Sequence, residues 1–186
     1  MKKLLLSSVM IIVLCTGALE AQVKQNLVKT SLTSVFFRTY VLAYERVFNA
    51  DMSVQLGAYY MGWSVGDAQL DGFAVTPEFR YYLSEKKDAP SGGFIAPFVR
   101  YQSYSLTSKD LDQGDPEYAK GTLSAIGGGI LVGYQRLFKE TISLSAFIGP
   151  AYNSGDVEYE SNEGAFDVDL FDGFGVRAGV NLGFAF

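Results

Sequence analysis

Apolar and polar residues alternate along the end of the chain, from Asp172 to Phe186. One set of alternate positions is apolar and consists of Phe174, Val176, Ala178, Val180, Leu182, Phe184 and Phe186. The other set is small or polar and consists of Gly173, Gly175, Arg177, Gly179, Asn181, Gly183 and Ala185. Alternation with a period of two predicts a β-strand that has one apolar and one polar face.

The same alternation recurs upstream and predicts an eight-stranded protein. The predicted strands cover about residues 23–34, 36–48, 52–64, 72–83, 93–106, 121–138, 141–155 and 171–186. Several are longer than the roughly five to six residues of a typical globular strand, and the last one ends on an aromatic residue. These features favour an all-β, eight-stranded antiparallel transmembrane barrel over a soluble β-sandwich.

The connections between the predicted strands alternate in length. Those at residues 48–51, 84–93 and 139–141 are short or moderate, whereas the polar stretches at 65–71, 107–120 and 156–170 predict longer loops. The first hairpin, near Ser34, is a tight exception on the long-loop side. Short turns at one end and long loops at the other are typical of bacterial outer-membrane barrels.

Three prolines, Pro77, Pro97 and Pro150, fall inside predicted strands. Proline cannot donate a ladder hydrogen bond, and a closed barrel has no edge strand that would tolerate it. We therefore expect a β-bulge at each proline, near the membrane boundaries.

The start of the chain has the layout of a secretory signal peptide. Met1-Lys2-Lys3 precedes an apolar run from Leu4 to Cys15, and the stretch that follows ends at Ala21. The run is shorter than the roughly 20 residues that a membrane-spanning helix needs. We predict a cleaved signal over residues 1–21, with cleavage after Ala18 as the alternative, and a single barrel domain over residues 22–186. A secretory signal in front of a transmembrane barrel predicts that the protein is located in the outer membrane of a Gram-negative cell.

The composition removes most enzyme chemistry. The chain has no histidine, and its only cysteine, Cys15, lies in the predicted signal. The commonest general base and the best nucleophile are thus missing from residues 22–186. We predict no enzyme, no cofactor and no metal site, although a Ser-Lys or carboxylate-only site remains open. Without Lys2, Lys3 and Glu20 the chain keeps 13 basic and 19 acidic residues, a net charge of −6 that does not favour nucleic acid.

Charged residues occupy the polar faces of several predicted strands. They are Glu45, Glu78, Arg80, Arg100 and Arg177, and they are accompanied by Gln55, Gln102, Gln135 and Asn181. In a closed barrel these side chains would point inward, and an eight-stranded barrel is narrow enough to be filled by its own side chains. We interpret the set as a structural polar network that fixes the register, in preference to a conducting pathway.

Two acidic segments bear on cation binding. Residues 110–115 resemble a calcium loop only in part, because Gly121 stands where the bidentate glutamate should be, and we expect a solvated loop there. Between Gly155 and Asp172 the chain carries seven acidic residues and no basic one. This second segment is either a self-repelling outer loop or a surface that could bind divalent cations or a basic partner.

Four segments resemble an uncharacterised family of small outer-membrane barrels, a domain of unknown function. They are Leu42-Ala43-Tyr44-Glu45-Arg46, Pro77-Glu78-Phe79-Arg80-Tyr81-Tyr82-Leu83, Ala96-Pro97-Phe98-Val99-Arg100-Tyr101 and Val132-Gly133-Tyr134-Gln135. The layout is similar to eight-stranded barrels of the OmpA and OmpX type. The resemblance implies a barrel in contact with outer-membrane lipids, and it gives Phe186 the role of a signal for the barrel-assembly machinery.

These observations predict a non-enzymatic outer-membrane barrel with a structural or surface-interaction role and acidic extracellular loops. One alternative is a narrow channel for small or apolar molecules. The other is a soluble secreted β-sandwich that binds a ligand or partner.

Overall fold

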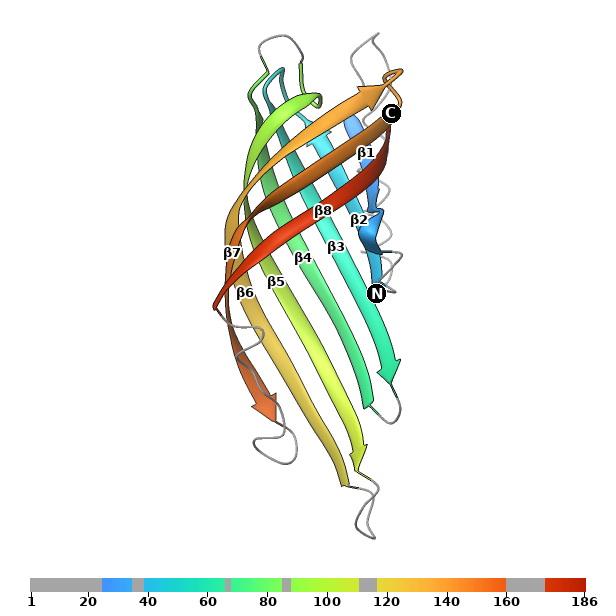
Figure 1. Ribbon diagram of the computed structural model, residues 1–186, viewed down its shortest axis with the longest axis vertical. Helices are drawn as coiled ribbons and strands as arrows, with labels where there is room; N and C mark the ends of the chain where they lie inside the picture. The colour runs from blue at the N-terminus through green and yellow to red at the C-terminus, as the bar shows by residue number, and fades with distance from the viewer. Residues whose placement is uncertain (1–24, 35–38, 66–67, 85–87, 111–116, 160–172) are drawn as a thin grey trace, which may run out of the picture.

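The fold is a closed antiparallel barrel of eight strands. The computed structural model describes residues 25–34, 39–65, 68–84, 88–110, 117–159 and 173–186. The strands are β1 (Asn26–Ser31), β2 (Thr39–Val47), β3 (Met52–Val65), β4 (Ala68–Tyr82), β5 (Gly92–Asp110), β6 (Glu117–Phe138), β7 (Ile142–Tyr159) and β8 (Gly173–Ala185). Each strand pairs with its neighbours in sequence, and β8 closes on β1 (Figure 1). The predicted all-β, eight-stranded fold is confirmed and excludes the β-sandwich, while the predicted signal at residues 1–21 lies outside the described residues.

The register of the strands gives the barrel its tilt. One circuit of paired positions starts at Ala185 and runs through Leu27, Glu45, Gln55, Glu78, Phe98, Gly129 and Ala151 to Gly175. The circuit returns to β8 ten residues before its start, so the shear number is 10. Closing a sheet requires such a stagger, and it tilts every strand relative to the barrel axis.

The prolines interrupt the hydrogen-bond ladder without shifting it. No pairing is made across β4 and β5 at Pro77 and Pro97, yet Val75↔Tyr101, Glu78↔Phe98 and Tyr81↔Ile95 keep one register. On β6 and β7 the pairing likewise resumes in register on both sides of Pro150. The expectation of bulges is therefore wrong at all three prolines. Each proline forgoes bonds to one neighbour only, and the intact ladder on its other side holds the strand straight.

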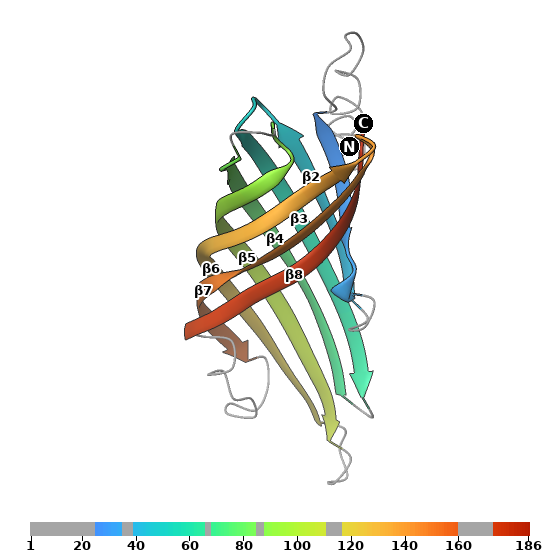
Figure 2. The ribbon, with the colours of Figure 1, turned by 45° about the horizontal axis from the view of Figure 1, so that its top comes forward.

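Two of the three predicted long loops are largely strand. β3 and β4 stay paired up to Val65↔Ala68, and β5 and β6 stay paired up to Asp110↔Glu117. The prediction failed because ladder hydrogen bonds join backbone groups and continue past the apolar band into polar sequence. The strands consequently grow from 6 residues in β1 to 22 in β6, which gives the barrel a short wall and a tall wall (Figure 2).

The two faces of the wall differ as the alternation predicts. The outer face carries apolar side chains on every strand, among them Val28, Leu42, Leu56, Val75, Val99, Ile130, Ile148 and Leu182. Tyr40, Tyr60, Tyr81, Tyr101 and Tyr134 are exposed on the same face, at positions suited to an interfacial belt. Tyr44 is only half-buried, and the side chain of Trp63 lies outside the described residues. Within the described part of the chain, no helix is long and apolar enough to cross a membrane.

Candidate functional site in the barrel interior

We call the end of the barrel at which the backbone of Asn26 pairs with that of Phe186 the terminal end. A cluster of charged and polar side chains fills the half of the lumen nearer to this end. Its members are Lys29, Glu45, Ser53, Glu78, Arg80, Tyr82 and Gln135, and we name it the polar plug. All seven are buried, and the exposed fraction of Glu45 and Arg80 is 0%. They come from β1, β2, β3, β4 and β6, so the plug joins both sides of the barrel.

The carboxylate of Glu45 is the centre of the plug. It forms an ion pair with the ammonium group of Lys29, and it accepts hydrogen bonds from Tyr82 at 2.6 Å and from Gln135 at 3.2 Å. The hydroxyl of Ser53 donates a further bond to it at 2.5 Å. A carboxylate with this many donors is stabilised in its charged form despite its complete burial.

Arg80 links the centre to a second acidic residue. Its Nε donates to Glu78 at 2.7 Å, its Nη1 donates to Gln135 at 2.9 Å, and the same Nη1 lies 3.7 Å from Glu45. The other oxygen of Glu78 accepts a bond from Arg177 at 3.3 Å. Aromatic rings cover these guanidinium groups, with Arg80 4.5 Å from the centre of the Phe94 ring. Ion pairs and hydrogen bonds therefore connect Lys29 through the plug to Arg177, which lies next to it.

The predicted interior residues occupy two levels. Glu45, Glu78 and Arg80 lie in the plug, and Arg177 borders it through Glu78. Arg100 takes no part in the ion pairs: its Nε has no hydrogen-bond partner in the described structure, and its guanidinium lies 5.4 Å from the Tyr59 ring centre. Among the described strand side chains, four basic residues and two acidic residues face the lumen, which leaves an excess of positive charge.

Three members of the plug, Lys29, Ser53 and Tyr82, were not among the residues predicted from the sequence. Lys29 is 1% exposed and shares a face with Leu27 and Ser31, which are also buried. The alternation of Leu27, Lys29 and Ser31 with Val28 and Thr30 was the available signal. It is weak because the strand has only six residues.

Cation binding receives no support from the described residues, in which no group of three or more acidic, histidine or cysteine side chains could hold a metal ion. Most of the acidic segment between Gly155 and Asp172, and most of residues 110–115, lie outside the described residues. The expectation of a divalent-cation surface there stays a prediction.

A closed barrel with an apolar exterior and a charged interior is the architecture of outer-membrane barrels. The chain belongs to the family described as protein of unknown function (DUF3575), whose model matches residues 9–169. Both parts of the predicted resemblance, a family of unknown function and an eight-stranded barrel, are thereby confirmed. No curated protein matches the chain.

Solved structures to which the chain is similar include those of three bacterial proteins. The N-terminal β-barrel domain of Pseudomonas aeruginosa OprF is 15% identical over 88% of this chain and 98% of its own, with a TM-score of 0.38. Acinetobacter baumannii CarO2 is 13% identical over 87% and 97%, with a TM-score of 0.47. A major outer membrane protein from Thermus thermophilus is 14% identical over 87% and 98%, with a TM-score of 0.48.

Proposed function

We propose that the protein is a non-enzymatic outer-membrane barrel that acts as a sealed anchor and presents its loops, including the acidic segment before Asp172, to the outside. The observation that carries the proposal is the polar plug. A lumen occupied by Lys29, Glu45, Arg80 and Gln135, all at most 1% exposed, leaves no water-filled path through that level. An apolar outer wall on a closed sheet suits a lipid environment, since the backbone groups are paired within the barrel over most of the sheet.

Several buried side chains that take no part in the ion pairs also help to close the lumen. Leu27, Phe94, Ala96 and Leu131 are buried at or beside the plug, and the rings of Tyr82 and Phe94 lie 5.7 Å apart. This packing opposes the alternative of a narrow channel that runs the length of the barrel. The lack of histidine in the chain, and of cysteine after the predicted signal, supports a role without catalysis.

Two measurements on the protein from isolated outer membranes test the proposal. The first is a gel of boiled and unboiled samples, in which a closed barrel migrates faster unboiled. The second is conductance in a planar bilayer, where the intact protein is expected to give no steps. Recovery in the soluble fraction, or regular conductance steps, would overturn the proposal.

A matched variant serves as a positive control for the conductance measurement. Tyr82→Ala combined with Phe94→Ala removes two buried rings from the seal and leaves the Lys29 and Arg80 ion pairs in place. This variant is expected to conduct weakly where the wild type does not. If both proteins conduct equally, the plug does not close the lumen.

A further inference from the structure

Among the described residues, no strand covers one edge of β8 beyond the end of β1, at the end of the barrel away from the pairing of Asn26 with Phe186. β1 pairs with β8 only from Leu27↔Ala185 to Ser31↔Asn181, with one further bond from Leu32 to Val180. Residues 173–179 of β8 therefore pair with no described strand on that side. Figure 2 shows β1 ending well before β3 does, so that over this stretch β8 has β7 on one side and no described strand on the other. We name this region the lateral opening.

The residues at the lateral opening have two properties expected of a passage between the lumen and the lipid: exposed apolar side chains and open space on the inner face. Phe174 and Val176, on the part of β8 that pairs with β7 but not with β1, are 88% and 75% exposed. Gly175 between them faces the lumen, and a Cβ placed there would meet no heavy atom within 4 Å. The described structure thus leaves both the edge of β8 and the lumen behind it uncovered.

A cavity of about 310 Å³ with polar and apolar lining residues lies in the lumen behind this opening, beyond the polar plug. Its lining includes the side chains of Arg100 and Arg177, together with Gln55, Thr76 and Asn181. Arg100 lacks an ion-pair partner in the described structure, and it lines the same cavity as Arg177. Two guanidinium groups that line one cavity, of which only that of Arg177 is paired with a carboxylate, that of Glu78, form a site for an anion.

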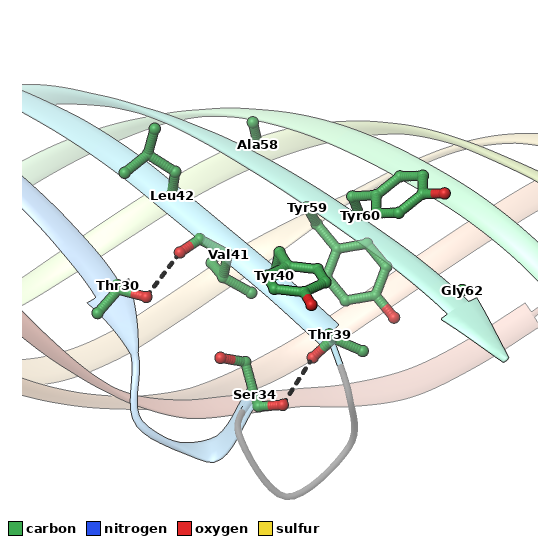
Figure 3. A pocket seen from close by; sticks show the side chains of 10 residues that line it. All are labelled: Thr30, Ser34, Thr39, Tyr40, Val41, Leu42, Ala58, Tyr59, Tyr60 and Gly62. Carbon is green, nitrogen blue, oxygen red and sulfur yellow. Dashed lines mark hydrogen bonds between the residues drawn. The ribbon is translucent and has the colours of Figure 1, made fainter.

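A groove on the wall continues from this cavity to the outer face. The groove measures about 910 Å³ and is lined by residues of β1, β2 and β3, among them Tyr40, Leu42, Ala58 and Tyr60 (Figure 3). Ser34, Thr39, Val41, Ala58 and Tyr59 line both the groove and the cavity. A polar anion site is therefore joined to a largely apolar surface, and each volume lies in the range of about 300–1,000 Å³ that is usual for ligand pockets.

We propose that the two spaces together bind a single-chain amphiphile with an anionic head group. The head group, a carboxylate or a phosphate, is held by Arg100 and Arg177 inside the lumen. The acyl chain passes through the lateral opening and lies along Leu42, Ala58 and Tyr60 on the outer face. The site does not require a pore, because the ligand enters and leaves sideways from the lipid.

Native mass spectrometry of the folded protein in a non-ionic detergent tests this proposal, with palmitate and hexadecyl phosphate as the anionic probes and hexadecanol as the uncharged probe. One anion is expected per barrel, with clear preference over hexadecanol, and the tighter of the two anions identifies the head group. No adduct, or equal binding of hexadecanol, would overturn the proposal.

Three variants locate the site. Arg100→Gln removes the unpaired charge and is expected to weaken binding about tenfold, the effect of losing one hydrogen bond to a charged group. Gly57→Phe fills the cavity, and its Cβ would lie no closer than 3.7 Å to another residue, so the backbone accommodates it. It is expected to abolish binding. Arg136→Gln removes an exposed positive charge from the outer face and should change nothing.

The boiled and unboiled gel of each variant separates loss of binding from loss of folding. Unchanged affinity in Arg100→Gln and Gly57→Phe would overturn the proposal even if the barrel is sealed. Conversely, conductance by the wild type would overturn the sealed anchor and leave the amphiphile site standing.

Discussion

Lys29 on β1 and Glu45 on β2 form a buried ion pair although they are not opposite each other in the sheet. Leu27 pairs directly with Glu45, and Lys29 pairs with Ala43, so the two charged residues are diagonal neighbours on the inner face. Diagonal neighbours are within reach of long side chains. This relationship fixes the register of the shortest hairpin in the barrel, because a shift by one residue would turn either charge toward the lipid face.

The coupling between this pair is measurable by a double-mutant cycle. Lys29→Met alone leaves the Glu45 carboxylate buried, with its hydrogen bonds to Tyr82 and Gln135 but without its nearest cation. Glu45→Gln alone leaves the Lys29 ammonium buried, with its hydrogen bonds to Gln55 and Gln135 but without its carboxylate. Each single variant is expected to lower the free energy of unfolding by about 3–5 kcal/mol. The double variant should lose less than the sum, by about 0.5–3 kcal/mol. Urea unfolding in detergent micelles supplies all four values, and strict additivity would show that the pair is not coupled.

Arg80→Ala should be among the most destabilising single substitutions in the chain. It removes the bond to Glu78 at 2.7 Å, the bond to Gln135 at 2.9 Å and the packing over Phe94, all in a site with 0% exposure. We expect a loss of about 3–5 kcal/mol, seen as a lower urea midpoint. Arg136→Ala, on the exposed outer face, is the control and should stay within about 0.5 kcal/mol of the wild type. Equal midpoints for the two variants would contradict a structural role for the plug.

The alternation of residues was sufficient to predict the fold but only part of the site. It assigns each side chain to a face, and so it placed five charged residues on one surface: Glu45, Glu78, Arg80, Arg100 and Arg177. It does not determine the register between neighbouring strands, because a shift of one strand by an even number of residues keeps every apolar side chain on the outer face. The shear of 10 decides which inner charges meet, and it brings Gln135 of β6 to the Glu45 of β2 at 3.2 Å.

The lateral opening was beyond prediction for a related reason. The residue pattern predicts a first strand over about residues 23–34, whereas β1 ends at Ser31. Strand ends depend on backbone pairing with both neighbours, which leaves little trace in the order of apolar and polar residues. The charge excess around Arg100 was hidden as well, since the sequence does not show which basic residues lack a carboxylate partner.

Two glycines on the inner face should respond oppositely to the same substitution. A Cβ at Gly133 would lie 2.6 Å from the carbonyl oxygen of Ala146 and 2.9 Å from a ring carbon of Phe94. Gly133→Ala is therefore expected to lower the free energy of unfolding by about 1–3 kcal/mol through overpacking. Gly175→Ala has open space around its new methyl group and should be neutral or slightly stabilising. A comparable loss in both variants would show that the lumen at Gly175 is as tightly packed as at Gly133.

Phe186 is expected to matter for assembly more than for stability. Its backbone closes the barrel through the hydrogen bond from its N–H to Asn26 at 2.9 Å and the return bond at 3.2 Å, and neither needs the ring. The ring itself is 47% exposed on the outer face. Phe186→Ala should thus leave the urea midpoint of the refolded protein within about 1 kcal/mol of the wild type, while the fraction that reaches the outer membrane in heat-modifiable form falls severalfold. Phe184→Ala, which removes another exposed ring from the same face of β8, is the control and should assemble normally. If Phe186→Ala assembles as well as the wild type, the terminal ring is an ordinary lipid-facing side chain; if both variants fail equally in the refolding assay, it acts by packing.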